Sequence, residues 1–563
     1  MILLTGGSGQ LGKELCKLGD YFAPTRAELD ITNQRQVYQA VVGNEPDLIV
    51  HAAAYTNTLG ADHDIDQMIT CWQTNVIGTR NLVDHAKCPI VYISTEAAIH
   101  PYSFYILSKL QGEMEVSRHK YGYTNIRTSF RQDPFEYDRA FTDMWTIGDY
   151  TKIIAWMLHD LIKRRPIQNR TIWLGTGEDS VSAGRTDPPR RKADLAERYQ
   201  SISTLTGGVG RRMNTLKKLA VAALTAALAV ALFPAPAHAA ARDSSFQVHP
   251  SGKGWCATLN VPVSPAEGQA RSWTVAATYC QPFRWTREVD ILTHGATYDH
   301  TYWDWPQQPN TYSYVGKTLA DGRAAVAYDR IGNGASTRPL STEITMTSDA
   351  WVLHQLVHLL RCLGYRHINS ISHSYGSAVA LAEAATTYPD AVKVDAVVLT
   401  GYLHRSSNPA VTAGNYPANQ DPKFAAAGLD NGYLTSRPGV RGTSFHAPTS
   451  DPEIVAYDDA HKDLVSLTGL LGFLAARGVP PNDNISNLVS VPVLVVNGQQ
   501  DAIFCYQPAV FNCADQAAVA ANEAPYYGDV EVHTVPDSGH DLTLHPSATV
   551  SYTIISTWIK EQS

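Results

Sequence analysis

The fold of the second half of the chain is decided by the stretch INSISHSYGSAVALAE, residues 368–383. Its first residues are typical of a buried strand, its centre is a sharp turn of small residues around Ser374, and its end is an Ala-rich helix. Such a turn lifts the serine hydroxyl above a sheet and aims the helix N-terminus at it. The usual pattern is Gly-x-Ser-x-Gly, and here Ser372 replaces the first glycine, a small-for-small change that the turn should tolerate.

Two further polar residues follow strands in the order that this turn requires. The strand at residues 491–496 runs into NGQQD, which places Asp501 at a strand's carboxyl end, and VPDSGHD (535–541) offers His540 on a turn before the last helix. The order Ser, acid, His predicts that His540 takes the proton from Ser374 while Asp501 orients the imidazole. Individually, Asp501 could be a turn-former and His540 a surface histidine. Asp537 and Asp541 adjoin the histidine and are weaker candidates for the acid.

The segment LTHGAT (292–297) leaves another strand and offers backbone donors for an oxyanion. We expect the amides of Ala296 and Tyr375 to form that oxyanion hole. Just beyond lie four aromatic residues, which either line an apolar substrate cleft or anchor the loop on the core: Tyr298, Tyr302, Trp303 and Trp305.

The first strand of the chain, residues 2–5, runs into GGSGQLG and then a helical pattern. Glycines 6, 9 and 12 allow a tight turn, approach of a pyrophosphate and close helix packing, which predicts dinucleotide binding. The predicted cofactor-binding residues are Gly6, Gly9, Gln10, Leu11, Gly12, Arg26, Asp30 and Ile31. The last three follow the second strand region and are expected at the adenosine end, where Arg26 is a candidate partner for a 2′-phosphate. The choice between NADP and NAD stays open.

A Tyr and a Lys share one helix face four residues apart, at Tyr105 and Lys109, after a strand that ends in Thr95. A cation one turn from a phenol is expected to lower the phenol's pKa, so that it exchanges a proton with a carbonyl while hydride moves to or from a nicotinamide. The three residues are therefore candidate catalytic groups. The same spacing also occurs by chance on exposed helices, and a non-catalytic nucleotide-binding or scaffold module is the alternative.

Strand-like runs alternate with helical patterns on both sides of a polar stretch, which predicts two α/β domains. Residues 1–177 should form a parallel sheet covered on both faces. Six strand-like runs after residue 240 predict a second sheet, at 273–277, 289–293, 324–328, 368–371, 396–399 and 491–496. A Pro-, Gly- and Asn-rich stretch at about 402–487 interrupts that rhythm and is interpreted as an inserted cap.

From residue 240 to 563 the sequence resembles the α/β-hydrolase family in its secreted, capped, esterase- or lipase-like form. The resemblance rests on the serine turn, the His-Gly pair, DRIGNG (329–334) and the Ser, Asp, His order. It implies an α/β-hydrolase sheet that hydrolyses small carboxylic esters through an acyl-enzyme and needs no cofactor. The serine nucleophile argues against epoxide and halide chemistries.

Residues 1–177 resemble an extended short-chain dehydrogenase/reductase of the dTDP-4-dehydrorhamnose reductase branch. The motifs are TGGSGQLG (5–12), LDIT (29–32), HAAAYT (51–56), TNV (74–76) and the Tyr-x-x-x-Lys pair. The resemblance implies a Rossmann-like domain that reduces a nucleotide-sugar ketone with NADPH. Two features depart from that branch: Thr95 and Tyr105 lie close together in sequence, and the part after Ser129 is short for a sugar-nucleotide subdomain.

The chain has 563 residues and a formal net charge of −8. It is too long for one core, so three or four units, or two large α/β domains, are expected. The absence of a basic excess argues against a nucleic-acid partner.

Cysteine usage changes along the chain. Close spacing favours disulfides between Cys256 and Cys280 and between Cys505 and Cys513 in an exported domain, which leaves Cys362 as a buried thiol. Metal binding is the competing interpretation, but without a Cys-x-x-Cys or paired-His spacing no metal site is predicted.

Between the two predicted domains lies a linker at residues 178–212, followed by a segment that resembles a secretory signal at residues 213–239. It has a basic start, an apolar core of about 15 residues and a small-residue exit, with cleavage expected after Ala239. A buried helix and an uncleaved membrane anchor are the alternatives, although the core is shorter than a span needs. We expect the hydrolase part to be secreted or extracytoplasmic, and the first domain to be cytoplasmic if it is separate.

Overall fold

The computed structural model describes residues 1–99, 103–131, 149–164, 169–174, 247–409 and 413–562. The predicted linker (178–212) and signal-like segment (213–239) lie outside these residues. Two large sheets are present, and each belongs to its own compact unit. The expected α/β class with two domains is confirmed.

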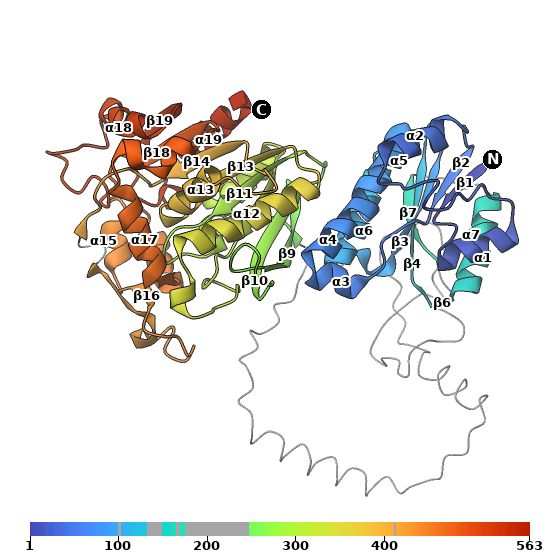
Figure 1. Cartoon of the computed structure of the whole chain (residues 1–563), viewed down its shortest axis with the longest axis horizontal. Helices are drawn as coiled ribbons and strands as arrows, with labels where there is room; N and C mark the ends of the chain where they lie inside the picture. Colours follow the sequence, from blue (N-terminus) through green and yellow to red (C-terminus); the bar gives the residue numbers. More distant parts are fainter. Residues whose placement is uncertain (100–102, 132–148, 165–168, 175–246, 410–412, 563) are drawn as a thin grey trace, which may run out of the picture. The chain divides into compact units, whose positions relative to one another are not determined.

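The first sheet has five parallel strands in the order β1-β2-β3-β4-β7 (Figure 1). Their bounds are β1 Ile2–Thr5, β2 Leu48–His51, β3 Ile90–Thr95, β4 Tyr123–Thr128 and β7 Arg170–Trp173. Successive strand side chains point to opposite faces, so Leu3 and Leu4 enter two separate apolar clusters. The sheet is therefore buried on both faces, as expected for parallel strands.

One face of this sheet packs against helices α2 and α5, and the other packs against α1 and α7 (Figure 1). The helices of this part of the chain are α1 Gln10–Leu18, α2 Gln34–Val42, α3 Thr58–His63, α4 Ile65–Trp72, α5 Thr79–His85, α6 Phe104–Ser117 and α7 Thr151–Arg164.

The second sheet has nine strands in the order β19-β18-β14-β13-β11-β12-β10-β9-β8, rather than the six that were predicted. Their bounds are β8 Gln247–Val248, β9 Gly254–Val263, β10 Trp273–Pro282, β11 Glu288–Thr293, β12 Ala324–Tyr328, β13 His367–His373, β14 Ala396–Thr400, β18 Val493–Gly498 and β19 Val530–Val535. The six strands from β12 to β19 are parallel, and β10, β9 and β8 add an antiparallel edge. The expectation missed β9 because its inward and outward residues alternate instead of forming one apolar run.

Between β14 and β18 the predicted cap region carries its own small elements. These are the strands β15 Asn415–Pro417, β16 Tyr433–Ser436 and β17 Val465–Ser466, and the helices α15 Val440–Ser444, α16 Pro452–His461 and α17 Leu467–Arg477. The main helices of the unit outside this region are α11 Tyr314–Ala320, α12 Met346–Cys362, α13 Tyr375–Ala385, α18 Gln516–Glu523 and α19 Ala548–Gln562.

Both predicted disulfides, Cys256 with Cys280 and Cys505 with Cys513, are present. The first joins directly opposed residues of β9 and β10. Cys362 is free but only half-buried, so the expectation of a buried thiol was wrong.

A buried ion pair ties the centre of the second sheet together. Asp290, in the middle of β11, accepts hydrogen bonds from the guanidinium of Arg323 at 3.0 and 3.2 Å and from the amide of Asn369 on β13 at 2.9 Å. Asp290 is fully buried and Arg323 almost so. The Asp290 carboxylate therefore has both a counter-ion and further hydrogen-bond donors, which offset the cost of burying its charge.

Arg323→Met should lower the free energy of unfolding of this unit by about 3–5 kcal/mol, because it leaves Asp290 buried without a counter-ion. Urea unfolding of the full chain, followed by tryptophan fluorescence, measures the loss. Arg366→Met, at an exposed arginine, is the matched control and should cost less than about 0.5 kcal/mol. Equal losses for the two variants would contradict a structural role for the pair.

Candidate active site

Ser374 stands on the turn between β13 and α13 with a left-handed backbone, φ 52° and ψ −115°. Its amide donates to the carbonyl of Thr400 at 2.8 Å, which holds the turn on the neighbouring strand. Two residues later, a Cβ on Gly376 would lie 2.6 Å from the carbonyl oxygens of Thr293 and His294. The turn therefore needs glycine at this position because the backbone leaving β11 passes directly beneath the helix start.

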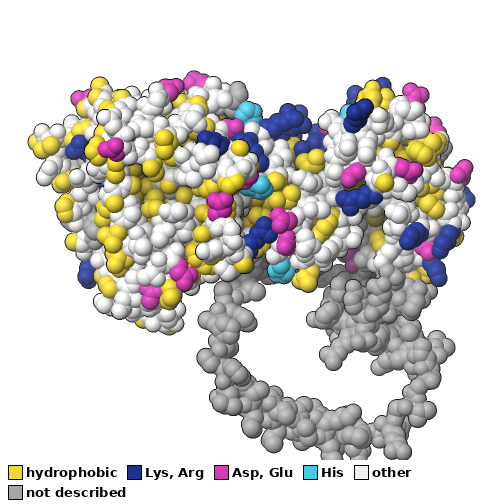
Figure 2. Space-filling view, viewed as in Figure 1, with side chains coloured by type: hydrophobic (Ala, Val, Ile, Leu, Met, Phe, Trp, Pro, Cys, Tyr) yellow, Lys and Arg dark blue, Asp and Glu magenta, His cyan; other side chains and the backbone are white. Residues whose placement is uncertain are grey.

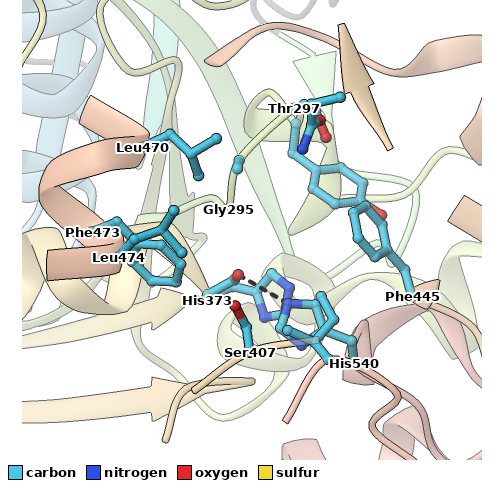
Figure 3. Close-up of a pocket in the computed structure, with 14 residues that line it drawn as sticks. Gly295, Thr297, His373, Ser407, Phe445, Leu470, Phe473, Leu474 and His540 are labelled. Carbon is cyan, nitrogen blue, oxygen red and sulfur yellow. Dashed lines mark hydrogen bonds between the residues drawn. The ribbon is translucent and has the colours of Figure 1, made fainter. Parts of the chain in front are cut away.

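The structure brings Ser374, His540 and Asp501 together. His540 Nε2 lies 2.9 Å from Ser374 Oγ, and a dashed line marks this hydrogen bond in Figure 3. His540 Nδ1 lies 3.0 Å from Asp501 Oδ2. The other oxygen of Asp501 accepts from the amides of Ile503 at 2.8 Å and Phe504 at 3.2 Å. The carboxylate is thus fixed by its own loop and faces the imidazole. Asp501 and His540 are both buried.

Burial and the nearby carboxylate act in opposite directions on His540. Desolvation favours the neutral ring and lowers its pKa, but the charge of Asp501 and its hydrogen bond outweigh burial, so the pKa is raised above 6.5. Such a histidine accepts a proton more readily than an isolated buried imidazole would.

A second histidine–carboxylate pair lies beside the first. His373 Nε2 is 3.1 Å from Asp541 Oδ1, and the rings of His373 and His540 are 4.8 Å apart between centroids. Tyr302 stacks on His373 at 4.4 Å. The sequence ranked Asp541 below Asp501 as the partner of His540, and the structure places Asp541 on His373 instead. No feature of the sequence pointed to His373.

Arg330 hydrogen-bonds to the backbone of the loop that follows β11. Its Nη2 donates to the carbonyl of Gly295 at 3.2 Å, and its Nη1 to Asp349 at 3.2 Å, while the Tyr375 hydroxyl also donates to Asp349 at 2.9 Å. In a planar trans peptide the C=O and N–H point in opposite directions, so holding the Gly295 carbonyl aims the Ala296 N–H away from Arg330. The sequence placed Arg330 after a strand but could not show this contact. The oxyanion role of Ala296 and Tyr375 stays a prediction.

A pocket opens in front of the serine (Figure 3). Its lining residues are Gly295, Ala296, Thr297, Tyr298, His373, Ser374, Ser407, Asn415, Phe445, Leu470, Phe473, Leu474, Ile503 and His540. The apolar wall comes largely from α17 and Phe445, and no carboxylate is among the lining residues. The pocket therefore favours an uncharged or anionic group over a cation.

The four aromatic residues after β11 divide between the two expected roles. Tyr298 lines the pocket, whereas Tyr302, Trp303 and Trp305 are almost completely buried and anchor the loop on the core.

The described residues include groups that could share a metal ion. His373, His540 and Asp541 are one such group, and Asp299, His300 and Asp329 are another. In the first group, both imidazoles are already hydrogen-bonded to carboxylates. The geometry is thus accounted for by side-chain pairing, and we assign no metal.

The glycine-rich turn follows β1 as expected. Gly6 has φ +74°, and a Cβ there would lie 2.6 Å from the amide nitrogen of Ala53. A Cβ on Gly12 would collide with the Gly6 carbonyl. The turn and the start of α1 are therefore packed as closely as glycine permits, and a turn of this kind at a helix N-terminus is the type that binds a pyrophosphate in dinucleotide-binding folds. Gly9 caps α1, which begins at Gln10.

The other predicted cofactor residues differ in exposure. Arg26 Nε lies 3.7 Å from Asp30 Oδ2, on the surface. The side chains of Leu11 and Ile31 are buried in the two apolar clusters, so only their backbones could meet a ligand. Thr95 ends β3, and its hydroxyl accepts a hydrogen bond from the amide of Ala97 at 3.4 Å.

The expected effect of Lys109 on Tyr105 was wrong. Desolvation raises the pKa of Tyr105 to about 12, with a smaller contribution from the neighbouring Cys71. Desolvation also lowers the pKa of Lys109 to about 8. Both groups share α6, but their burial outweighs the attraction that the spacing predicted.

Comparison with known proteins assigns both parts of the chain. Residues 1–131 match the RmlD substrate binding domain family, and residues 291–551 match the alpha/beta hydrolase family. The chain combines an RmlD-like domain with an α/β-hydrolase domain. No helix in the described ranges is both long and apolar enough to cross a membrane.

Relatives match the two domains separately. A dTDP-4-dehydrorhamnose reductase of Aggregatibacter actinomycetemcomitans is 29% identical over 218 residues, covering 35% of this chain and 64% of the reductase. A proline iminopeptidase of Clostridium botulinum is 27% identical over 103 residues, covering 18% of this chain and 32% of the peptidase. The chain thus spans less than two thirds of either relative.

A solved dTDP-4-dehydrorhamnose reductase from Bacillus anthracis, in complex with NADP, is 27% identical with a TM-score of 0.27. The match covers 31% of this chain and 73% of that reductase.

Asp501→Asn should lower the pKa of His540 by about 1–3 units, to below 6.5, because burial remains while the opposing charge is lost. Histidine NMR of the hydrolase, with the His540 signal assigned from the spectrum of His540→Gln, measures the change. Asp537→Asn, at an exposed aspartate, is the control and should leave the titration in place. An unchanged His540 pKa in Asp501→Asn would show that the Asp501 carboxylate does not stabilise the protonated imidazole.

Proposed function

We propose that the α/β-hydrolase domain cleaves carboxylic esters through an acyl-enzyme on Ser374. The observation that carries the proposal is the hydrogen-bonded chain from Ser374 through His540 to Asp501, at the edge of a pocket. A nucleophile in contact with a base that is itself oriented by a carboxylate is the arrangement that acyl transfer requires.

In the first half of the reaction, His540 Nε2 takes the proton of the Ser374 hydroxyl while Oγ attacks the ester carbonyl carbon. The carbonyl oxygen becomes an oxyanion, for which the N–H groups of Ala296 and Tyr375 are the proposed donors. The protonated His540 then gives its proton to the departing alcohol as the C–O bond breaks. Asp501 stabilises the charged ring throughout and keeps its own negative charge.

In the second half, water attacks the acyl group on Ser374 with His540 as base, and the carboxylic acid leaves as the serine recovers its proton. The strained elbow supports this cycle because it presents Oγ to the pocket in each step.

The lining of the pocket favours an ester over the free amino terminus of a peptide. A charged amine needs an acidic anchor, because burying an unpaired cation is costly. None of the lining residues carries a carboxylate, so the pocket offers no such anchor for the substrate of an iminopeptidase, the activity in the name of one relative.

We also infer that the hydrolase domain acts outside the cytoplasm. The support is the pair of disulfides together with the signal-like sequence pattern at residues 213–239.

Ser374→Ala should lower kcat for short-chain aryl esters by on the order of 10⁴-fold or more, because the nucleophile is removed. Release of the aryl alcohol, followed by absorbance, measures it. Ser377→Ala, three residues along α13, removes a buried hydroxyl outside the pocket lining and is the matched control. Undiminished turnover in Ser374→Ala would remove the proposal.

A second function belongs to the RmlD-like domain, which we propose to be a nicotinamide dinucleotide-binding reductase module acting on a nucleotide-sugar. The close-packed turn of Gly6 and Gly12 supports it, since a larger residue at either position would clash with neighbouring backbone and open the turn. NADP or NAD would sit with its pyrophosphate on the start of α1 and supply hydride chemistry. We propose that Tyr105 and Lys109 exchange the proton and that Thr95 is the third catalytic residue.

The full chain should bind NADPH saturably, with enhanced nicotinamide fluorescence, and Gly9→Asp should weaken binding at least about tenfold by placing charge and bulk beside the pyrophosphate. Ser374→Ala, altered only in the hydrolase domain, is the control and should bind like the parent. Absence of saturable binding by the parent chain would discard the module's function.

A further inference from the structure

Arg477, the last residue of the cap helix α17, is a buried cation that makes no direct ion pair with a described carboxylate, although the nearby charge of Asp501 partly offsets the lowering of its pKa by burial. It is 4% exposed. Its guanidinium donates to the carbonyl of Arg405 at 3.1 Å, to Ser407 Oγ at 3.1 Å and, more weakly, to the carbonyl of Phe473 at 3.4 Å. It also faces the rings of Phe473 at 4.3 Å and Phe504 at 5.3 Å.

The other buried arginines of the hydrolase domain are treated differently. Each faces a buried carboxylate, in the pairs Arg323 with Asp290, Arg330 with Asp349 and Arg441 with Asp458. An unpaired buried charge is costly, and carbonyl oxygens and ring faces offset that cost only in part. Burial lowers the pKa of Arg477 to about 10, which still leaves it charged at neutral pH.

Ser407 connects this charge to the pocket. Its oxygen accepts from Arg477, so its own proton is left to donate, and the described residues offer no acceptor for it. Ser407 lines the same pocket as Ser374 and His540, and Figure 3 shows its side chain on the side of the pocket where that pair meets. A hydroxyl polarised by a cation is a strong donor toward an anionic oxygen.

The rest of the pocket restricts what can meet that donor. Its walls are apolar, from Phe445 and the α17 residues Leu470, Phe473 and Leu474, and its lining contains no competing carboxylate. A ligand that fits is apolar along its chain and carries one anionic, planar acceptor. A terminal carboxylate has this chemistry, and it would add a negative charge near Arg477 beside that of Asp501.

We propose that the pocket selects esters whose acyl chain ends in a carboxylate, that is, half-esters of short dicarboxylic acids. The Ser407 hydroxyl donates to that carboxylate, and Arg477 supplies the charge behind it. This inference rests on the proposed ester hydrolysis and names its substrate class.

The test compares esters matched in chain length. Monomethyl succinate, glutarate and adipate are paired with methyl butanoate, pentanoate and hexanoate, and kcat/KM is measured by product chromatography. For at least one length, the carboxylate ester should be preferred about tenfold or more, the effect of one hydrogen bond to a charged group. Equal rates, or a preference for the neutral ester at every length, would overturn the inference.

Ser407→Ala removes a half-buried hydroxyl, and Arg477→Met removes the charge at similar length. Each should reduce the selectivity ratio about tenfold, while Arg477→Lys retains part of it. Leu471→Ala, at an exposed residue of the same helix that does not line the pocket, should leave the ratio unchanged. A ratio that is the same in Ser407→Ala as in the parent would contradict the assignment.

Binding to the inactive Ser374→Ala chain separates this inference from the proposed reaction. Calorimetry should show saturable binding of the preferred half-ester, about tenfold weaker once Ser407→Ala is added. If the parent chain cleaves no ester but Ser374→Ala binds the half-ester, the reaction fails and the carboxylate pocket stands. If Ser374→Ala binds no half-ester, the carboxylate pocket is overturned even where simple esters are cleaved.

Discussion

The active site depends on the strained backbone of Ser374, which persists only because its surroundings leave no alternative. A non-glycine residue with positive φ relaxes unless neighbouring contacts over-determine it. Here the chain leaving β11 passes against Gly376, the Ser374 amide is held by β14, and Arg330 ties the β11 loop to Asp349 beside the helix. The hydroxyl that meets His540 is therefore positioned by packing between three strands and two helices, not by the turn alone.

The positions of Ser374, Asp501 and His540 could be predicted because each follows a parallel strand, and the carboxyl ends of parallel strands share one edge of a sheet. The contacts of Arg330 and Arg477 could not, since their partners are distant in sequence and nothing local distinguishes a buried arginine from an exposed one. The strand β9 was missed although its link to β10 through Cys256 and Cys280 was predicted, because its buried and exposed residues alternate and it lacks the continuous apolar run by which the predicted strands were recognised.

The first domain shows where spacing alone is insufficient. A period of 3.6 residues correctly places Tyr105 and Lys109 on one helix, but it says nothing about how far either group is from water. Desolvation penalises the charged form of both residues, so the phenol becomes a weaker acid and the amine a weaker base. Their proposed exchange of a proton would require an environment that a bound ligand alters, which sequence periodicity cannot describe.

Charged and polar side chains of the cap contact the residues around the candidate active site. Arg441 and Asp458 form a buried pair within it, and Arg441 also donates to the Thr297 hydroxyl at 2.8 Å, one residue beyond Ala296. The Tyr298 hydroxyl lies within hydrogen-bond distance of both Asp458 and Asp541, and its single proton can go to either; the Asp541 carboxylate also pairs with His373, which packs beside the His540 ring. Because buried charges interact strongly at short range, a change in the cap is expected to affect both the loop at Ala296 and the His540 ring. In the proposed reaction the cap would therefore influence the chemical step as well as the wall of the pocket.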